Sequence, residues 1–206
     1  MIVIIDIGMG NIGSILNMIK YLHHDALVSR NKEEITAAEK IILPGVGSFD
    51  TAMRRLKEHD LITTLTEQVL GRKVPILGIC LGIQLFTRKS EEGTEAGLGW
   101  IDAETIRFRT QEDTPLRIPH MGWNTAIPSR DSFLFRNSGD EPRFYFVHSY
   151  HLVCHDPGDI LSTTRYGYEF PSAITHENIY GVQFHPEKSH RFGIRMFQNF
   201  LEADSC

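Results

Sequence analysis

A cysteine between two glycines, in Gly78-Ile79-Cys80-Leu81-Gly82, is the residue of this sequence best suited to nucleophilic chemistry. An apolar run precedes it and a helical pattern follows, which predicts a strand, a tight turn and a helix with Cys80 at the apex. The helix N-terminus would direct N–H groups and its positive dipole end at the sulfur, which favours the reactive thiolate. A buried cysteine at a strand end is the alternative interpretation.

A histidine and a glutamate two residues apart form the second candidate group. Residues 178–184 predict a strand, and His185-Pro186-Glu187 follows it directly. Side chains two residues apart in extended chain point to the same side, and Pro186 stiffens this spacing. The pair is therefore typical of a base with its own orienting carboxylate, whereas an isolated His-x-Glu is more often an exposed polar pair.

A glycine loop, Pro44-Gly45-Val46-Gly47, follows the predicted strand at residues 39–43. In a parallel sheet, this loop and Cys80 lie beyond the same edge. We expect the backbone N–H groups of Leu81 and of the Val46-Gly47 loop to bind an oxyanion there. A simple strand-to-helix turn is the alternative.

Together these groups predict acyl-transfer chemistry. Cys80 would attack a carbonyl carbon, and His185 would accept the thiol proton and return it to the leaving group. Glu187 would fix the tautomer and orientation of the His185 ring. Water would then cleave the thioester.

The order of the predicted elements indicates an α/β fold. Strands and helices alternate through residue 90, which predicts a parallel sheet with helices on both faces. We expect the helix after Cys80 to end near residues 88–90. After Gly97 we expect an edge strand at residues 100–109, a loop at 110–119, antiparallel strands and a closing helix at 189–201. The length predicts one domain over residues 1–206.

Composition limits the classes of partner and the cellular compartment that we expect. The formal net charge of −5 argues against nucleic acid or an anionic membrane as a partner. No apolar stretch is long enough for a membrane span, and residues 2–5 are too short for a signal sequence. The odd set of cysteines, Cys80, Cys154 and Cys206, favours a reducing, cytoplasmic compartment, with Cys154 in the core and Cys206 at a loose terminus.

Two other chemistries are less favoured by the sequence. Gly8-Met9-Gly10-Asn11-Ile12-Gly13 after a strand matches a dinucleotide-binding pattern, but the next strand ends at Arg30 and not at an acid that holds a ribose. A turn that lets the first helix lie close to the sheet explains the glycines equally well. There is no Cys-x-x-Cys and the histidines are scattered, so we expect no metal, and we expect no cofactor.

The sequence resembles the class I (triad) glutamine amidotransferases, and within them the glutaminase subunits of imidazole glycerol phosphate synthase, over nearly the whole chain. The motifs that carry the resemblance are Asp6 to Asn11, Pro44-Gly-Val-Gly47, Gly78-Ile-Cys-Leu-Gly-Ile-Gln84, Pro119-His-Met-Gly-Trp-Asn124, Phe146-Val-His-Ser-Tyr150 and Gly181-Val-Gln-Phe-His-Pro-Glu-Lys188. The resemblance implies a three-layer αβα fold with a mostly parallel central sheet and antiparallel additions in the C-terminal half. It also implies hydrolysis of glutamine to glutamate and ammonia.

The resemblance further implies a heterodimer with a separate (βα)8 cyclase that receives the ammonia in histidine biosynthesis. Gln84, Ser149 and Tyr150 would help to hold glutamine, with Gly47 beside it. Met121 and Trp123 would lie at the partner interface, and Lys188 would lie there near the ammonia exit.

Some positions depart from this pattern. Ile7 stands where members often have tyrosine, and the tail Lys188-Ser-His-Arg-Phe-Gly193 resembles paralogues that supply ammonia to sugar-amidinating enzymes of surface-polysaccharide synthesis. That acceptor is the main alternative. A γ-glutamyl peptidase and a binding module with a relic triad are further alternatives.

Overall fold

The structure is a computed structural model that describes residues 1–110 and 115–203. In the first half, strands and helices alternate along the chain. These elements are β1 (Ile2–Ile5), α1 (Ile12–Tyr21), β2 (Ala26–Ser29), α2 (Lys32–Thr36), β3 (Lys40–Gly45), α3 (Phe49–Glu58), α4 (Ile62–Thr66), a π-helical turn (Glu67–Gly71), β4 (Ile76–Cys80) and α5 (Leu81–Leu85).

The second half consists mainly of strands. They are β5 (Ala103–Arg107), β6 (His120–Thr125), β7 (Ile127–Pro128), β8 (Arg143–His148), β9 (Tyr150–Cys154), β10 (Ile160–Tyr166), β11 (Tyr168–His176) and β12 (Ile179–Val182). Short 3-10 turns cover Phe133–Phe135, Pro157–Asp159 and Pro186–Lys188, and α6 (His190–Glu202) closes the described chain.

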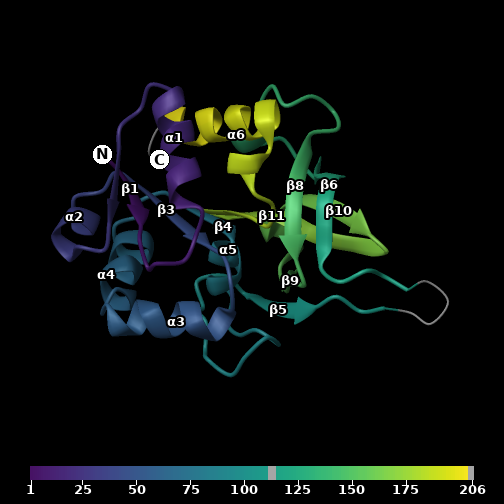
Figure 1. Ribbon diagram of the computed structural model, residues 1–206, viewed down its shortest axis with the longest axis horizontal. Coiled ribbons are helices and arrows are strands. Elements are labelled where there is room, and N and C mark those ends of the chain that lie inside the picture. The colour runs from purple at the N-terminus through teal and green to yellow at the C-terminus, as the bar shows by residue number, and fades with distance from the viewer. Residues whose placement is uncertain (111–114, 204–206) are drawn as a thin grey trace.

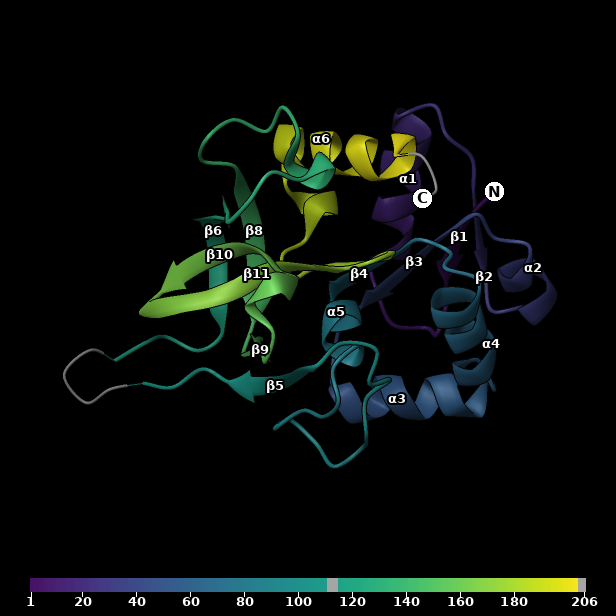
Figure 2. The same ribbon diagram turned by 180° about the vertical axis from the view of Figure 1, so that it is seen from behind.

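A central sheet of eight strands has the order β2-β1-β3-β4-β12-β11-β10-β7. The pairs from β2 to β12 are parallel, whereas β11, β10 and β7 add on in antiparallel pairing. Helices α1 and α6 cover one face and α3, α4 and α5 the other (Figure 1, Figure 2). The predicted αβα architecture, with its parallel centre and antiparallel C-terminal additions, is confirmed.

Two apolar clusters, one on each face, hold these layers together. In β1, Val3 and Ile5 point into the cluster beneath α3, while Ile2 and Ile4 point into the cluster beneath α1 and α6. A strand buried on both faces needs an unbroken apolar run, which is what residues 2–5 supply. That residues 1–206 form one domain stays a prediction.

The parallel strands bring the candidate residues to one edge of the sheet. Gly45 at the end of β3 lies opposite Cys80 at the end of β4, and Val182 at the end of β12 lies opposite Ile79. The chain reaches His185 three residues after β12 ends. The carboxyl edge of three adjacent strands therefore collects the predicted glycine loop, nucleophile and base.

The helix after Cys80 was predicted to extend to residues 88–90, and this is wrong. Helix α5 ends at Leu85 because the following carbonyls bond elsewhere: Leu98 N–H donates to Leu85 O and Trp100 N–H to Phe86 O. The predicted edge strand at 100–109 is shorter, Ala103–Arg107, and pairs with β9 in a separate two-stranded sheet. Long-range backbone bonds of this kind leave no trace in local periodicity.

The remaining expectations have mixed outcomes. Cys154 is half-buried and packs against the core rather than within it, and Cys206 lies outside the described residues, as does the middle of the predicted loop at 110–119. Among the described residues no helix has the length and apolar character that crossing a bilayer requires.

Candidate functional site

The turn at Cys80 is sharp and strained. Cys80 has φ 55° and ψ −106°, a conformation that side chains rarely adopt. The strand and helix can meet this closely only because residue 82 has no side chain: a Cβ on Gly82 would lie 1.9 Å from the carbonyl oxygen of Leu43. The predicted strand–turn–helix with the thiol at its apex is what the structure contains.

His185 and Glu187 form a buried pair. The Nδ1 of His185 lies 2.8 Å from Oε1 of Glu187, and their side chains are 2% and 1% exposed. The backbone of His185 is fixed as well, because its N–H donates to Tyr145 O (2.8 Å) and its carbonyl accepts from the Ser189 hydroxyl (2.6 Å). Ser189 in turn accepts from Tyr145 N–H (3.0 Å). Strand β8 and the start of α6 thus hold the backbone of His185 in place.

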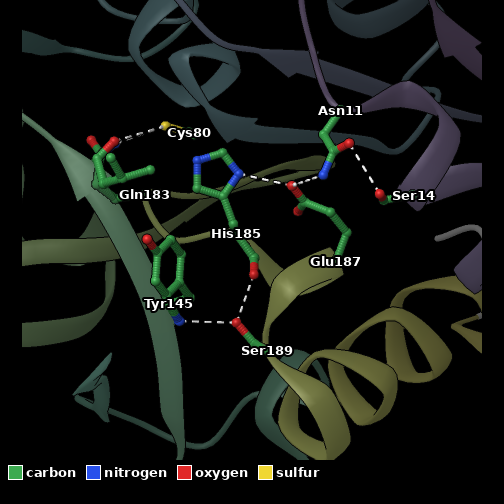
Figure 3. Close-up of polar contacts among 9 residues, drawn as sticks. Asn11, Ser14, Cys80, Tyr145, Gln183, His185, Glu187 and Ser189 are labelled. Carbon is green, nitrogen blue, oxygen red and sulfur yellow. Dashed lines mark hydrogen bonds and ion pairs between the residues drawn. The ribbon is translucent and has the colours of Figure 1, made fainter. Parts of the chain in front are cut away.

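The imidazole of His185 lies between Cys80 and Glu187, as Figure 3 shows. Burial by itself lowers the pKa of His185, but the Cys80 sulfur on one side and the Glu187 carboxylate on the other raise it to about 10. Nε2 is buried and has no hydrogen-bond partner among the described nitrogen and oxygen atoms. The three predicted residues are therefore assembled as thiol, imidazole and carboxylate in sequence.

Two side chains that the sequence analysis did not single out support this triad. Asn11, just before α1, donates from Nδ2 to Oε1 of Glu187 at 3.4 Å, and its own Oδ1 accepts from the Ser14 hydroxyl. On the other side, the buried Gln183 directs its Nε2 at Cys80 Sγ over 3.8 Å. Asn11 belongs to the stretch that matched a dinucleotide pattern, and in the structure it bonds to the carboxylate of Glu187.

A cavity of about 340 Å³ opens beside the sulfur, which is within the range of small-molecule sites. Its walls come from the β3–α3 loop, the Cys80 turn, the β8–β9 turn and the loop after α5. The lining residues are Val46, Gly47, Cys80, Leu81, Gln84, Glu92, Pro119, Val147, His148, Ser149, Tyr150 and His185.

All six residues predicted for the oxyanion site and the substrate line this cavity. Val46 is exposed, Gly47 has φ 101°, and Leu81 is the first residue of α5. The Nε2 of Gln84 is already engaged, since it donates to Tyr150 O and to Gln183 Oε1, both at 3.0 Å. Among residues 1–110 and 115–203 no hydrogen bond to its Oε1 is formed, which leaves that atom for a ligand. The roles of these six residues stay predictions.

Glu92 is the one carboxylate in the cavity wall that the sequence analysis missed. It lies in the loop after α5, and its Oε2 accepts from the N–H of Phe49, the first residue of α3. Burial raises the pKa of Glu92. No local signal marks this residue, because its loop reaches the site only by folding back against α3.

The residues predicted for a partner interface share one surface. On the β6–β8 sheet, Met121 is 61% and Trp123 40% exposed, and Trp123 pairs with Tyr145 across the strands. The ring of Trp123 stacks on His190 with centroids 5.4 Å apart, and Lys188 Nζ lies 5.7 Å from the Tyr145 ring centroid. We call Met121, Trp123, Tyr145 and Lys188 the β6–β8 patch. Large exposed apolar side chains grouped in this way are typical of interaction surfaces.

The part of the chain covered by the structure, 1–110 and 115–203, contains no group of histidine, cysteine and acidic side chains that could hold a metal ion.

Comparisons with known proteins agree with this geometry. The family model described as glutamine amidotransferase class-I matches residues 3–203. The chain is 52% identical to a protein of Methanococcus maripaludis and 48% identical to one of Pseudomonas aeruginosa, both named imidazole glycerol phosphate synthase subunit HisH 2, over 98% of this chain and 99% of each relative. A protein named subunit HisH in Bdellovibrio bacteriovorus is 45% identical over 98% of this chain and 100% of its own.

Solved structures show the same fold at low identity. One described as a glutamine amidotransferase has a TM-score of 0.76 at 19% identity and covers 97% of both chains. PurLQS from Thermotoga maritima has a TM-score of 0.71 at 17% identity, covering 97% of this chain and 96% of that one.

Proposed function

Since the chain belongs to the class I glutamine amidotransferases, we propose that it is the glutaminase subunit of an imidazole glycerol phosphate synthase, which hydrolyses glutamine to glutamate and ammonia. The observation that carries this proposal is the His185 imidazole lying between a strained thiol and a buried carboxylate at the mouth of a cavity. The names of the full-length relatives point to the same activity.

The first half of the reaction forms a thioester. The Cys80 sulfur attacks the side-chain amide carbon of glutamine, and the electron pair of the C=O bond moves onto the oxygen. When the tetrahedral intermediate collapses, the C–N bond breaks and His185 gives its proton from Nε2 to the departing nitrogen, which leaves as ammonia. Glu187 stabilises the imidazolium before that transfer and keeps the ring in place.

The second half regenerates the enzyme. Neutral His185 accepts a proton from water as the water oxygen attacks the thioester carbon. The C–S bond breaks, glutamate leaves, and the sulfur is again paired with the protonated ring. Leu81 N–H at the start of α5 and a backbone N–H of the Val46-Gly47 loop are the proposed oxyanion donors in both halves.

Glu92 is the proposed partner of the substrate's α-ammonium group. It is a carboxylate in the cavity wall, and an anion there is attracted to a cationic ligand more strongly than in water. Ser149, Tyr150 and Gln84 Oε1 are the proposed contacts to the rest of glutamine. Glutamine analogues that keep the γ-carboxamide but lack the α-amino group should therefore bind less well than glutamine.

We further propose that the chain works in the cytoplasm as a heterodimer with a (βα)8 cyclase, and that the β6–β8 patch is the docking surface. The relatives are named as subunits of a synthase, and the patch presents Met121 and Trp123 with a cation beside them. Tryptophan anchors of this kind carry much of the binding energy of protein interfaces. The cited relatives carry the synthase name, which favours histidine biosynthesis over the surface-sugar acceptor.

The test is ammonia release from glutamine by wild type and Cys80→Ala, each with and without the purified cyclase. We expect slow release by the isolated wild type, faster release with the cyclase and none from Cys80→Ala. Full activity of Cys80→Ala would rule out Cys80 as the nucleophile. Equal turnover with and without the cyclase would rule out the coupling, and co-purification of a sugar-modifying enzyme instead would establish the other acceptor.

A further inference from the structure

Behind one wall of the cavity, two buried histidines and an asparagine form a continuous chain of hydrogen bonds that the reaction steps above do not use. Asn124 Nδ2 lies 3.2 Å from Nε2 of His120, and His120 Nδ1 lies 3.0 Å from Nε2 of His148. His148 Nδ1 lies 2.7 Å from the carbonyl oxygen of Tyr150. His120 is 3% and His148 5% exposed.

The direction of every bond in this chain follows from its two ends. A carbonyl oxygen only accepts, so Nδ1 of His148 carries the hydrogen and, in a neutral ring, Nε2 is an acceptor. His120 must then donate from Nδ1, which makes its own Nε2 the acceptor for the Asn124 amide. The Asn124 amide has a fixed orientation, because Oδ1 accepts from Thr125 N–H (2.8 Å) and Nδ2 also donates to Arg165 O (3.0 Å). Both histidines are thereby fixed as Nδ1–H tautomers.

The surroundings keep both rings neutral. His120 is sandwiched between Phe146 and Tyr166, with ring centroids 4.7 and 4.1 Å away. Phe108 and Phe170 approach His148 to 5.2 and 5.4 Å. Burial lowers the pKa of His120 to about 4 and that of His148 well below its ordinary value. A charge on His148 would also place a second hydrogen between the two rings, and a charge on His120 would place one between its Nε2 and the Asn124 amide, so either charge breaks the hydrogen-bond chain.

The hydrogen-bond chain ends on the cavity wall that faces Cys80. The Tyr150 carbonyl that accepts from His148 also accepts from Gln84 Nε2, so it joins the β8–β9 turn to α5. The turn contributes Val147, His148, Ser149 and Tyr150 to the cavity, and Val147 O lies 4.0 Å from Cys80 Sγ. A shift of this turn changes the substrate contacts and the space beside the sulfur together.

We propose that Asn124, His120 and His148 are positioning residues for the glutaminase reaction: their directional chain fixes the β8–β9 turn in its substrate-binding position. This inference rests on the proposed function. The hydrogen-bond chain begins on β6, where His120 and Asn124 face inward while Met121 and Trp123 between them are exposed. The docking surface and the cavity wall are therefore two sides of one pair of strands.

The matched test separates hydrogen bonding from packing at position 120 in the full chain. His120→Asn loses the ring but places an amide nitrogen near the position of Nδ1, so it can still donate to His148. His120→Phe keeps the ring volume and has no donor. We expect KM for glutamine to rise about tenfold in His120→Phe with a smaller change in kcat, and to stay within about threefold in His120→Asn.

If position 120 acts only through packing, KM for glutamine should rise more in His120→Asn than in His120→Phe. That result, or wild-type kinetics in His120→Phe, overturns the proposal. Nitrogen-15 NMR of the wild type gives an answer that does not depend on how the variants fold. Both rings should show a protonated Nδ1 and an unprotonated Nε2 at pH 7, and an Nε2–H tautomer or a charged ring at either position contradicts the chain. Failure of the wild type to release ammonia would instead refute the proposed function.

Discussion

Replacing Glu187 by glutamine keeps the shape of the triad and removes only its buried negative charge. The carboxylate lies 2.8 Å from the ring of His185, with both side chains almost fully buried. Two unit charges about 4 Å apart interact by about 4 kcal/mol at an effective dielectric constant of 20. The imidazolium that protonates the leaving nitrogen loses that stabilisation, so we expect kcat to fall about 10³-fold.

The assay is ammonia release at saturating glutamine, with the alkylation rate of Cys80 at pH 7 as a second reading. Alkylation should slow in Glu187→Gln as well, because a less basic His185 assists the attack of the sulfur less. Glu33→Gln, an exposed glutamate on α2, is the matched control and should behave as wild type. A kcat for Glu187→Gln within about threefold of wild type would refute the reasoning that the carboxylate stabilises a charged ring.

Three further outcomes follow from the same structure. The folded-state pKa of His185, about 10, is above the ordinary histidine pKa of 6.5, so the stabilisation from its protonated form is complete below pH 6.5 and is lost as pH rises through about 10. Urea unfolding should therefore show the stability advantage of wild type over His185→Gln shrinking across that window, and a constant advantage would contradict the pKa. A Cβ at Gly93 would lie 1.9 Å from Asp50 Oδ1. That oxygen accepts from the Thr94 and Glu95 N–H groups and so anchors the loop that carries Glu92. Gly93→Ala should therefore raise KM for glutamine at least tenfold, but should not raise KM for the deamino analogue 4-carbamoylbutanoate. Trp123→Ala should weaken binding to the cyclase at least tenfold by calorimetry, and unchanged affinity would move the docking surface elsewhere.

The triad could be predicted from the sequence because each part has a strong local signal. Cys80 is marked by its flanking glycines, which the close contact of Gly82 with Leu43 requires. His185 and Glu187 are set by a strand and a proline. Their convergence followed from the rule that parallel strands end at one edge, and the pairing of Gly45 with Cys80 realises that rule.

The residues that the sequence did not reveal act through long-range contacts. Glu92 bonds to Phe49, 43 positions away, and Gln183 reaches Cys80 across 103 positions. The chain from Asn124 to Tyr150 depends on the register of β6 against β8, which pairs His120 with His148. Register between distant strands is set by tertiary packing, and periodicity within a segment does not contain it.

The helix after Cys80 is a second case in which long-range contacts, absent from the local sequence pattern, decide the structure. Its residues favour a longer helix, but hydrogen bonds from residues 97–101 to carbonyls 85–88 end it at Leu85. The backbone groups of this turn are satisfied by a loop that returns to it, so local propensity was overridden by tertiary pairing.

Whether Cys80 is the nucleophile can be tested by treating the protein with a thiol-directed glutamine analogue and locating the adduct by mass spectrometry. One adduct on Cys80 is expected, formed more slowly in the presence of excess glutamine and much more slowly in His185→Ala. Equal labelling of Cys154, or labelling of Cys80 that neither glutamine nor His185→Ala slows, would contradict a nucleophile activated by the imidazole in a glutamine site.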